Sequence, residues 1–366
     1  MREALTSFLA EVDKLHRFLD ASDAEEELTT SLLGRPEKDR EDLGELLSSI
    51  QKTRTTKRRQ NYVSCIVVLY GALERYVEEA VSEFTEALVQ IPGHYSELPK
   101  ALREQHLRLS IEYLASLKDG KVRETEDLAS VVGALHGCLN GHYPFKLNAR
   151  AFSLRSSNMK LGRIREIMGS LDIAYTGRRI LSTCSYDKYL GETSGISASN
   201  MQDSEVQANL DHVDELVVLR NDIAHGVYSI ESIEDNDLVR ERAHKLCAFV
   251  AATNDILVCE LLKYRISAEH AVQIEGEVKV YGDNIVCFPW LSGRIALGDT
   301  LIMKPAAPNA DLRHGAIQSI QINNVDHEDV EGKDELMIGV RVPFKVKANG
   351  TFFVIMQKNE SDKLPR

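Results

Sequence analysis

The sequence predicts an α+β protein of two domains, an all-α helical bundle over residues 1–268 followed by a small antiparallel β-barrel over residues 269–366. Three observations support this prediction. Up to about residue 265 the apolar residues recur at steps of three and four, without the alternation of strands. From about residue 272 the chain consists of short β-rich runs separated by Gly, Asp and Asn. A length of 366 residues suits two domains.

The helices are predicted from apolar stripes. The first stripe consists of Leu5, Phe8, Val12, Leu15 and Leu19. The longest helix is expected over about residues 43–88, with a solvated first half and a buried stripe in its second half. Further helices are expected at about 100–118, 124–139, 160–171, 204–225 and 236–265. Ser204 and Gln207 fit a capping box at the start of the fourth of these.

The strands are predicted from short runs rich in β-branched and aromatic residues. These runs cover residues 275–288, 298–305, 315–325, 335–342 and 350–356. Because each run is short and ends at turn residues, the pattern is typical of a small barrel or sandwich.

The formal net charge of −12 excludes a uniformly basic surface for nucleic acid, so any RNA contact must use local basic patches. Two such patches are present, at residues 52–59 and 146–179. The residues expected to contact RNA are Lys57, Arg58, Arg59, Arg155, Lys160 and Arg163.

Three aromatic residues, Phe145, Phe152 and Tyr175, accompany the second basic patch. Cations mixed with aromatic rings suit a surface that holds phosphates and stacks bases. The alternative is an ordinary solvated basic surface.

The six cysteines occur singly, without a CxxC pair, and we expect them to be reduced, buried thiols. The N-terminus does not resemble a signal peptide, and no apolar run approaches the roughly 20 residues of a membrane-spanning helix. We therefore expect a cytoplasmic protein without a membrane partner.

Motifs of several enzyme classes are missing from the sequence. It contains no GxxxxGK[ST] phosphate loop, no GxSxG, no HExxH and no GxGxxG after a strand. The histidines show no spacing typical of metal ligands. The sequence therefore favours a reaction without metal or cofactor.

One short motif, RNDIAHG, suits such a reaction, because its Arg220 and His225 supply a phosphate-gripping fork and a proton-transfer group. The bare Arg-x4-His spacing is weak evidence, since a second match exists at Arg265 and His270. Polar residues after the arginine and a glycine after the histidine distinguish the first match.

RNDIAHG resembles the signature of the HEPN superfamily of all-helical ribonucleases, and NYVSCIVVLYGALERYVEEAVSEF is similar to the second conserved helix of its MAE-type branch. The resemblance covers about residues 1–265. It implies an endoribonuclease that leaves 2′,3′-cyclic phosphate and 5′-hydroxyl ends, in a bacterial toxin or antiphage system, with an antitoxin or trigger protein as a further partner. It implies that Arg220 and His225 are the catalytic pair, that Asn221 is the polar residue beside them, and that Glu74 orients the arginine.

Each of these residues has a structural alternative. Arg220 can pair with Asp214 or Glu215, and His225 can cap the C-terminus of a helix. Glu74 can be a carboxylate at the edge of a buried helix face. The alternative function is a non-catalytic HEPN protein that binds RNA or acts as an adaptor.

The spacing of the motif also bears on oligomeric state. Five residues at 100° each place Arg220 and His225 about 140° apart around a regular helix. Either the helix breaks at the motif or two chains face each other. The resemblance implies the second arrangement, because HEPN nucleases generally pair, so a homodimer or larger even oligomer is expected.

The C-terminal part has its own resemblance. LSGRIALGDTLIMKP and GAIQSIQINNVDHEDVEGKDELMIGVRV are similar to the second-domain barrel of translation GTPases, over about residues 273–356. In those factors the barrel contacts the acceptor end of aminoacyl-tRNA, which implies tRNA as a candidate target here. The alternative is a barrel that serves only dimerisation or sensing.

Overall fold

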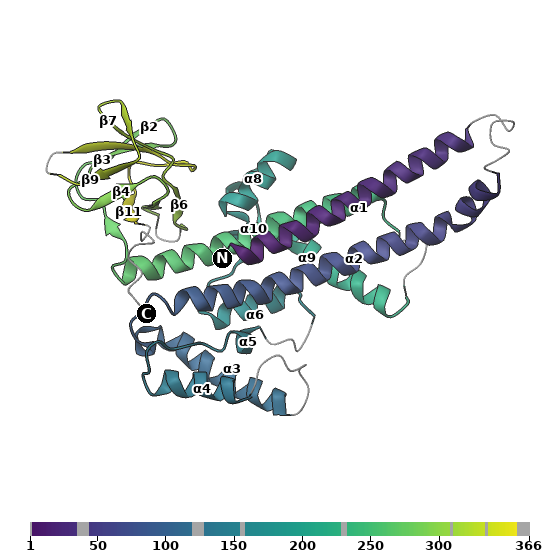
Figure 1. The fold of residues 1–366 in the computed structure, drawn as a ribbon, viewed down its shortest axis with the longest axis horizontal. Helices are drawn as coiled ribbons and strands as arrows, with labels where there is room; N and C mark the ends of the chain where they lie inside the picture. The colour runs from purple at the N-terminus through teal and green to yellow at the C-terminus, as the bar shows by residue number, and fades with distance from the viewer. Residues whose placement is uncertain are drawn as a thin grey trace. The chain divides into compact units, whose positions relative to one another are not determined.

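The computed structural model describes residues 2–34, 44–118, 128–153, 158–227, 233–307, 310–333 and 336–356. The chain forms two compact units. The helical unit comprises Met1–Val89 and Gly93–Leu257, and the β unit comprises Gln90–Pro92 and Val258–Arg366. Helices make up the first unit and antiparallel strands most of the second (Figure 1), which confirms the predicted α+β class.

The main helices lie close to the predicted ranges. They are α1 (Glu3–Leu33), α2 (Gly44–Leu88), α3 (Lys100–Lys118), α4 (Leu128–Leu139), α6 (Leu161–Ser170), α9 (Asp203–Ala224) and α10 (Asn236–Ser267). The short helices α5 (Ala149–Phe152), α7 (Gly177–Leu181) and α8 (Cys184–Thr193) were not predicted. Helices α5 and α7 have only four and five residues, and the ten residues of α8 include two buried ones, Tyr186 and Leu190, so none of the three shows an apolar stripe over several turns.

The start of α9 differs from the prediction. The helix begins at Asp203, and the side chain of Glu205 accepts a hydrogen bond of 2.7 Å from the backbone N–H of Gln202. Ser204 lies inside the helix, so the capping box predicted at Ser204 and Gln207 is wrong by two residues. The acidic Glu205 caps the helix start in its place.

The core of the helical unit forms where α1, α2 and α10 meet. The stripe predicted on α1 is largely buried, and Phe8 packs edge-on against Tyr76 of α2 with ring centroids 5.9 Å apart. The Tyr76 hydroxyl donates a hydrogen bond of 3.0 Å to the carbonyl of Val250 in α10. The first half of α2 is exposed over residues 51–60, as predicted, because it carries no apolar stripe.

The described strands of the β unit form three antiparallel sheets. Their orders are β1-β11-β5-β6, β2-β3-β10-β7-β8 and β4-β9. The strands are β1 (Val272–Gln273), β2 (Lys279–Tyr281), β3 (Ile285–Pro289), β4 (Arg294–Ala296), β5 (Thr300–Lys304), β6 (Arg313–Ala316), β7 (Ser319–Ile322), β8 (Val325–His327), β9 (Asp329–Glu331), β10 (Met337–Arg341) and β11 (Thr351–Ile355).

The predicted barrel is wrong, because these sheets do not close into a cylinder. Each of the two larger sheets has unpaired edge strands, and both contribute side chains to one buried core. Phe288 and Trp290 meet Leu301 and Phe352 in that core. Closure depends on pairing between strands far apart in the sequence, and local runs of β-rich residues do not reveal that pairing.

None of the described helices is long and apolar enough to span a membrane. None of the six cysteines forms a disulfide. Cys65, Cys138 and Cys259 are buried and Cys247 and Cys287 are half-buried, but Cys184 is exposed, so the prediction of burial is wrong for Cys184.

Candidate active site

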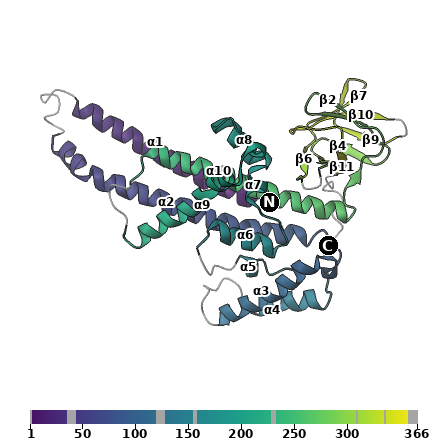
Figure 2. The same ribbon diagram turned by 180° about the vertical axis from the view of Figure 1, so that it is seen from behind.

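Helix α9 carries the RNDIAHG motif and packs beside α2 in both views of the ribbon (Figures 1 and 2). Its buried face includes Leu210, Val213 and Val217. Arg220 therefore falls at the edge of that face and is half-buried, whereas His225 is exposed.

Helix α9 ends at Ala224, and His225 occupies its C-cap position, as the structural alternative for this residue expected. Gly226 has a φ of +69°, a conformation that disfavours side chains. Its N–H donates to the carbonyl of Ile223 at 3.2 Å, and the N–H of Val227 donates to the carbonyl of Asp222 at 3.0 Å. This pattern is a Schellman turn, and it explains the glycine of the motif.

The helix does not break between Arg220 and His225. The backbone N–H of His225 still donates to the carbonyl of Asn221 at 2.9 Å, as in a regular helix. A helix break was one of the two arrangements expected from the sequence. The turn lies after His225 and not between Arg220 and His225, so it does not bring these two side chains together. Their angular separation stays close to the roughly 140° of a regular helix.

The guanidinium of Arg220 lies over the ring of Tyr70 in α2, with Cζ 5.0 Å from the ring centroid. Its Nη1 donates a hydrogen bond of 3.0 Å to Oδ1 of Asn221. A cation over an aromatic face is stabilised by the ring quadrupole. Asn221 therefore holds one N–H group of the guanidinium, and the ring of Tyr70 supports the guanidinium from another side.

The two carboxylates expected as structural partners of Arg220 contact other groups. Asp214 accepts a hydrogen bond of 2.7 Å from the N–H of Leu161, at the first turn of α6. Glu215 lies 3.3 Å from Arg242 of α10. A carboxylate at a helix N-terminus is favoured electrostatically, so Asp214 anchors α6 to α9.

Glu74 is linked to Arg220 through Tyr70. The Tyr70 hydroxyl donates a hydrogen bond of 2.6 Å to Oε1 of Glu74, one turn further along α2. Burial raises the pKa of Tyr70 to about 12, with the nearby Glu74 carboxylate adding to the effect. The hydroxyl thus stays protonated and keeps donating.

Lys160 lies next to this cluster. The N–H of Met159 donates to the Tyr70 hydroxyl at 3.2 Å, and the N–H of Leu161 donates to Asp214. Lys160 stands between these two anchored residues, and its side chain is exposed. Of the residues predicted to contact RNA, Lys160 therefore has its backbone next to the Tyr70 and Arg220 cluster.

The other predicted RNA contacts lie elsewhere. Arg163 lies on α6 and pairs with Glu166 at 2.9 Å, and Arg155 lies outside the described residues. Lys57, Arg58 and Arg59 are on α2, 11 to 13 residues before Tyr70, which corresponds to about 17–20 Å along the helix axis.

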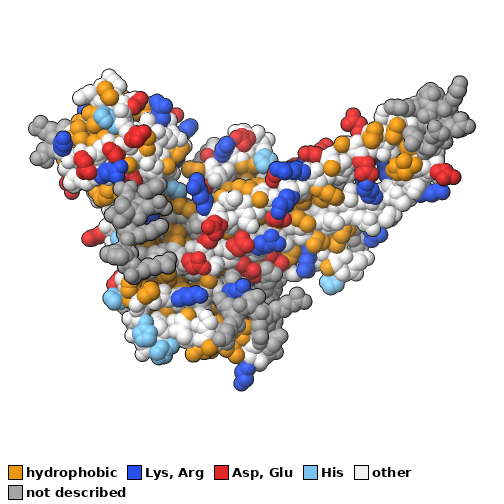
Figure 3. Space-filling view, in the orientation of Figure 1, with side chains coloured by type: hydrophobic (Ala, Val, Ile, Leu, Met, Phe, Trp, Pro, Cys, Tyr) orange, Lys and Arg blue, Asp and Glu red, His pale blue; other side chains and the backbone are white. Residues whose placement is uncertain are grey.

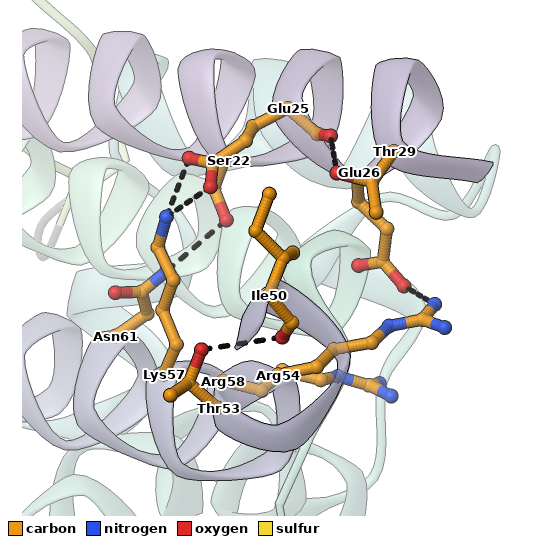
Figure 4. A pocket seen from close by; sticks show the side chains of 10 residues that line it. All are labelled: Ser22, Glu25, Glu26, Thr29, Ile50, Thr53, Arg54, Lys57, Arg58 and Asn61. Atoms are coloured by element: carbon orange, nitrogen blue, oxygen red, sulfur yellow. Dashed lines mark hydrogen bonds and ion pairs between the residues drawn. The ribbon is translucent and has the colours of Figure 1, made fainter. Parts of the chain in front are cut away.

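Part of the basic patch on α2 is paired with acidic residues of α1. Figure 4 shows the cleft between the two helices, where Lys57 reaches Glu25 and Arg54 reaches Glu26. Arg58 lines the same cleft. Lys57 is exposed, as predicted, and its acidic partner comes from another helix, which the sequence pattern does not show. On the face in Figure 3, blue and red side chains are mixed over the helical unit.

The prediction that aromatic residues of the second patch stack bases is wrong. Phe145, Phe152 and Tyr175 are at most 6% exposed. Phe152 stacks on the buried ring of His106, and Tyr175 shares a hydrogen bond of 2.5 Å with Thr253. These rings belong to the core of the helical unit.

Tyr70 belongs to the site but was not expected there from the sequence. It lies in the second half of α2, where a buried apolar stripe was predicted, and it is 2% exposed. Its place one helical turn before Glu74 was the available signal. Among the described residues there is no group of three or more His, Cys, Asp or Glu side chains that could hold a metal ion.

A family model described as RiboL-PSP-HEPN matches residues 35–258, which is more than half of the chain. HEPN domains are typically ribonucleases or RNA-binding domains, so the family links the chain to RNA at that coarse level. A comparison with curated proteins found no match. The match covers α2 through most of α10, including the cluster around Arg220, and the chain belongs to the RiboL-PSP-HEPN family.

Proposed function

We propose that this protein is a metal-independent endoribonuclease with Arg220 and His225 as its catalytic pair. The observation that supports this most directly is the placement of the Arg220 guanidinium over the ring of Tyr70, with Cζ 5.0 Å from the ring centroid, on the end of α9 that leads to the exposed His225. A cation–π contact needs no oxygen or nitrogen acceptor, so it takes none of the conventional hydrogen bonds of the guanidinium. The remaining N–H edge can therefore grip a phosphate.

The proposed reaction is an attack by the RNA on itself. An imidazole of His225 removes the proton of the 2′-hydroxyl, and the 2′-oxygen bonds to the adjacent phosphorus. The bond from phosphorus to the 5′-oxygen breaks, and that oxygen takes up a proton from a His225 imidazolium, so that one proton is removed and one is returned. The products are a 2′,3′-cyclic phosphate and a 5′-hydroxyl, without water or metal in the balance. Proton transfer by a histidine contributes typically 10²- to 10⁴-fold.

Two chains are proposed to form the complete site. Because α9 stays helical through His225, one chain does not bring both side chains to one phosphate, and a facing copy supplies the second motif. Exposed apolar side chains lie within one turn of Tyr70 on α2 and of Arg220 on α9. They are Val67 and Val68 on α2 at 46% and 43% exposure and Val218 on α9 at 47%. Such residues suit a surface that a second copy covers.

RNA is proposed to run from the Arg220 cluster along the exposed half of α2. Lys160 adds a cation beside the cluster, and Arg58 and Arg59 lie about 17–18 Å away along α2. This arrangement provides local attraction within an acidic protein, and binding should weaken as salt rises.

The setting proposed is the cytoplasm, in a toxin or antiphage system, with an antitoxin or trigger protein as a further partner. The matching family is RiboL-PSP-HEPN, so the MAE-type branch that the sequence resembles is not carried further. The β unit is proposed to recognise a tRNA end or a translation component. Its segment 271–366 holds 11 basic and 13 acidic residues, so it offers selectivity more than general affinity for RNA. Removal of that segment should change the distribution of cut sites, and an unchanged distribution would count against targeting.

The alternative is a non-catalytic protein that binds RNA or acts as an adaptor. It uses the same phosphate-gripping arginine but does not need His225. RNA binding without cleavage by the purified dimer would favour this alternative.

The experiment that separates the two uses alanine variants. Arg220→Ala and His225→Ala should each lower RNA cleavage by at least 10²-fold while the thermal unfolding temperature stays within a few degrees. The control is the double variant Arg265→Ala with His270→Ala, which removes the second match to the spacing and should stay active. Full activity of a folded His225→Ala variant would refute the catalytic assignment.

A further inference from the structure

Tyr70 is the point at which three separate parts of the helical unit meet. The residue is 2% exposed and belongs to α2. Its ring lies under Arg220 of α9, its hydroxyl donates to Glu74, and the same hydroxyl accepts the N–H of Met159 just before α6. One side chain therefore touches the catalytic arginine and the segment that carries Lys160.

The ring fixes the arginine in a way that a carboxylate cannot. A carboxylate partner would take two N–H donors of the guanidinium in a fork-to-fork pair. The Tyr70 face takes none, and Asn221 accepts from Nη1 only. The guanidinium is therefore held in position while part of its N–H edge stays available for a phosphate.

The hydroxyl of Tyr70 has two further effects. Because it donates to a carboxylate, electron density on the ring increases, and the attraction for the cation above it is strengthened. Because it also accepts from Met159, it fixes the backbone next to Lys160. Burial raises the pKa of Tyr70 to about 12, so both contacts persist across the range in which RNA is stable.

We propose that Tyr70 is the positioning residue of the site, which orients Arg220 toward the scissile phosphate and holds Lys160 beside it. The substrate feature that this arrangement recognises is a phosphodiester, which Arg220 of α9 and Lys160 just before α6 would bind together. This inference rests on the proposed function, since it assigns a role to Tyr70 only through Arg220 and Lys160.

Two substitutions separate the ring from the hydroxyl. Tyr70→Leu removes the aromatic face and should lower kcat about 10- to 30-fold, the upper part of the range that a desolvated cation–π contact supports. Tyr70→Phe keeps the face but releases Met159, so it should raise KM a few-fold with kcat within about threefold of the original.

The matched control is Tyr186→Leu. Tyr186 is as buried as Tyr70, and its hydroxyl donates 2.9 Å to the carbonyl of Asn209 in the same helix α9, but it belongs to α8. This substitution should lower thermal stability by a similar amount and leave kcat and KM within about twofold. Equal loss of activity in Tyr186→Leu and Tyr70→Leu would overturn the inference, because a general loss of packing would then explain both.

A second measurement does not depend on cleavage. A single-stranded RNA with 2′-O-methyl groups at every position lacks the nucleophile, so its Kd reports phosphate binding alone. Tyr70→Leu should weaken this binding several-fold in the original protein and by less than twofold in an Arg220→Ala background. Equal weakening in both backgrounds would show that Tyr70 does not act through Arg220.

The two proposals can fail separately. If the original protein cuts no RNA but Tyr70→Leu still weakens binding only when Arg220 is present, the nuclease proposal fails and the positioning role stands. If the protein cuts RNA and both Tyr70 variants match it in kcat, KM and Kd, the positioning role fails and the nuclease proposal stands.

Discussion

Gly226→Ala tests whether the Schellman turn after His225 matters for catalysis. The glycine has a φ of +69°, and a Cβ at this position would meet nothing within 4 Å. The substitution therefore adds backbone strain without a steric clash. A left-handed conformation costs a residue with a Cβ about 1–2 kcal/mol. For a unit of this size, that corresponds to a decrease of about 2–8 °C in Tm.

The substitution Gly226→Ala should lower kcat more strongly than it lowers the stability of the fold. The strained alanine shifts the last turn of α9 toward a frayed or extended helix, which moves the imidazole of His225. Misplacement of a catalytic group by about 1 Å can cost 10²-fold, so kcat should fall about 10-fold or more. Gly226→Asn should recover most of the activity, because asparagine tolerates the left-handed conformation better than alanine.

The matched control is Gly195→Ala at the end of α8. Gly195 has a φ of +68° and also leaves open space for a Cβ, but it lies far from the motif in the sequence. Urea unfolding and single-turnover cleavage of a fluorescent RNA measure both variants. The two should lose similar stability, and only Gly226→Ala should lose activity. Equal cleavage rates in the two variants would refute the link between this turn and His225.

Three further predictions concern pH, chemistry and assembly. Burial lowers the pKa of His106 to about 4 and that of His212 to about 3, below the roughly 6.5 of an unfolded chain, so the fold favours neutral imidazoles and loses stability as pH falls from about 6.5 toward 4. Urea unfolding at pH 7 and pH 5 measures this decrease in the free energy of unfolding, and His106→Gln should make it smaller by about 2 kcal/mol. An unchanged pH dependence would contradict the role of the buried His106 imidazole. Cleavage should persist in excess chelator and stop when the sugar at the cut site is 2′-deoxy; undiminished cutting of the deoxy substrate would exclude the proposed nucleophile. Light scattering should give an even multiple of 41.0 kDa, whereas an active monomer at assay concentration would exclude the facing arrangement.

The longer parts of the helical unit were predictable because their apolar stripes run over several turns. The stripe from Phe8 to Leu19 and the stripe in the second half of α2 both face the core. The sequence did not reveal α5, α7 or α8, which carry no apolar stripe over several turns. The longer strands fall within the predicted β-rich runs to within one residue, but β1, β4 and β9 lie outside them. The sheet order depends on pairs such as β1 with β11, whose paired residues are 80 and 82 positions apart.

The candidate site was only partly predictable. Arg220, Asn221 and His225 stand together in one motif, so their proximity follows from the sequence. Tyr70 is 150 positions from Arg220, and its role depends on how α9 packs on α2. Lys57 was predicted as a solvated cation because its partner Glu25 lies on α1, 32 residues away. The aromatic residues near basic ones were predicted to stack bases, but these rings are buried in the core of the helical unit and cannot reach a base.

The chemistry of the cut ends tests the central claim most directly. Purified protein is incubated with a short RNA in excess chelator, and the products are separated and weighed by mass spectrometry. The proposed attack by the 2′-hydroxyl predicts a 2′,3′-cyclic phosphate on one fragment and a 5′-hydroxyl on the other, lost in Arg220→Ala and His225→Ala. Fragments with a 3′-hydroxyl and a 5′-phosphate, or equal cleavage by the His225→Ala variant, would contradict it.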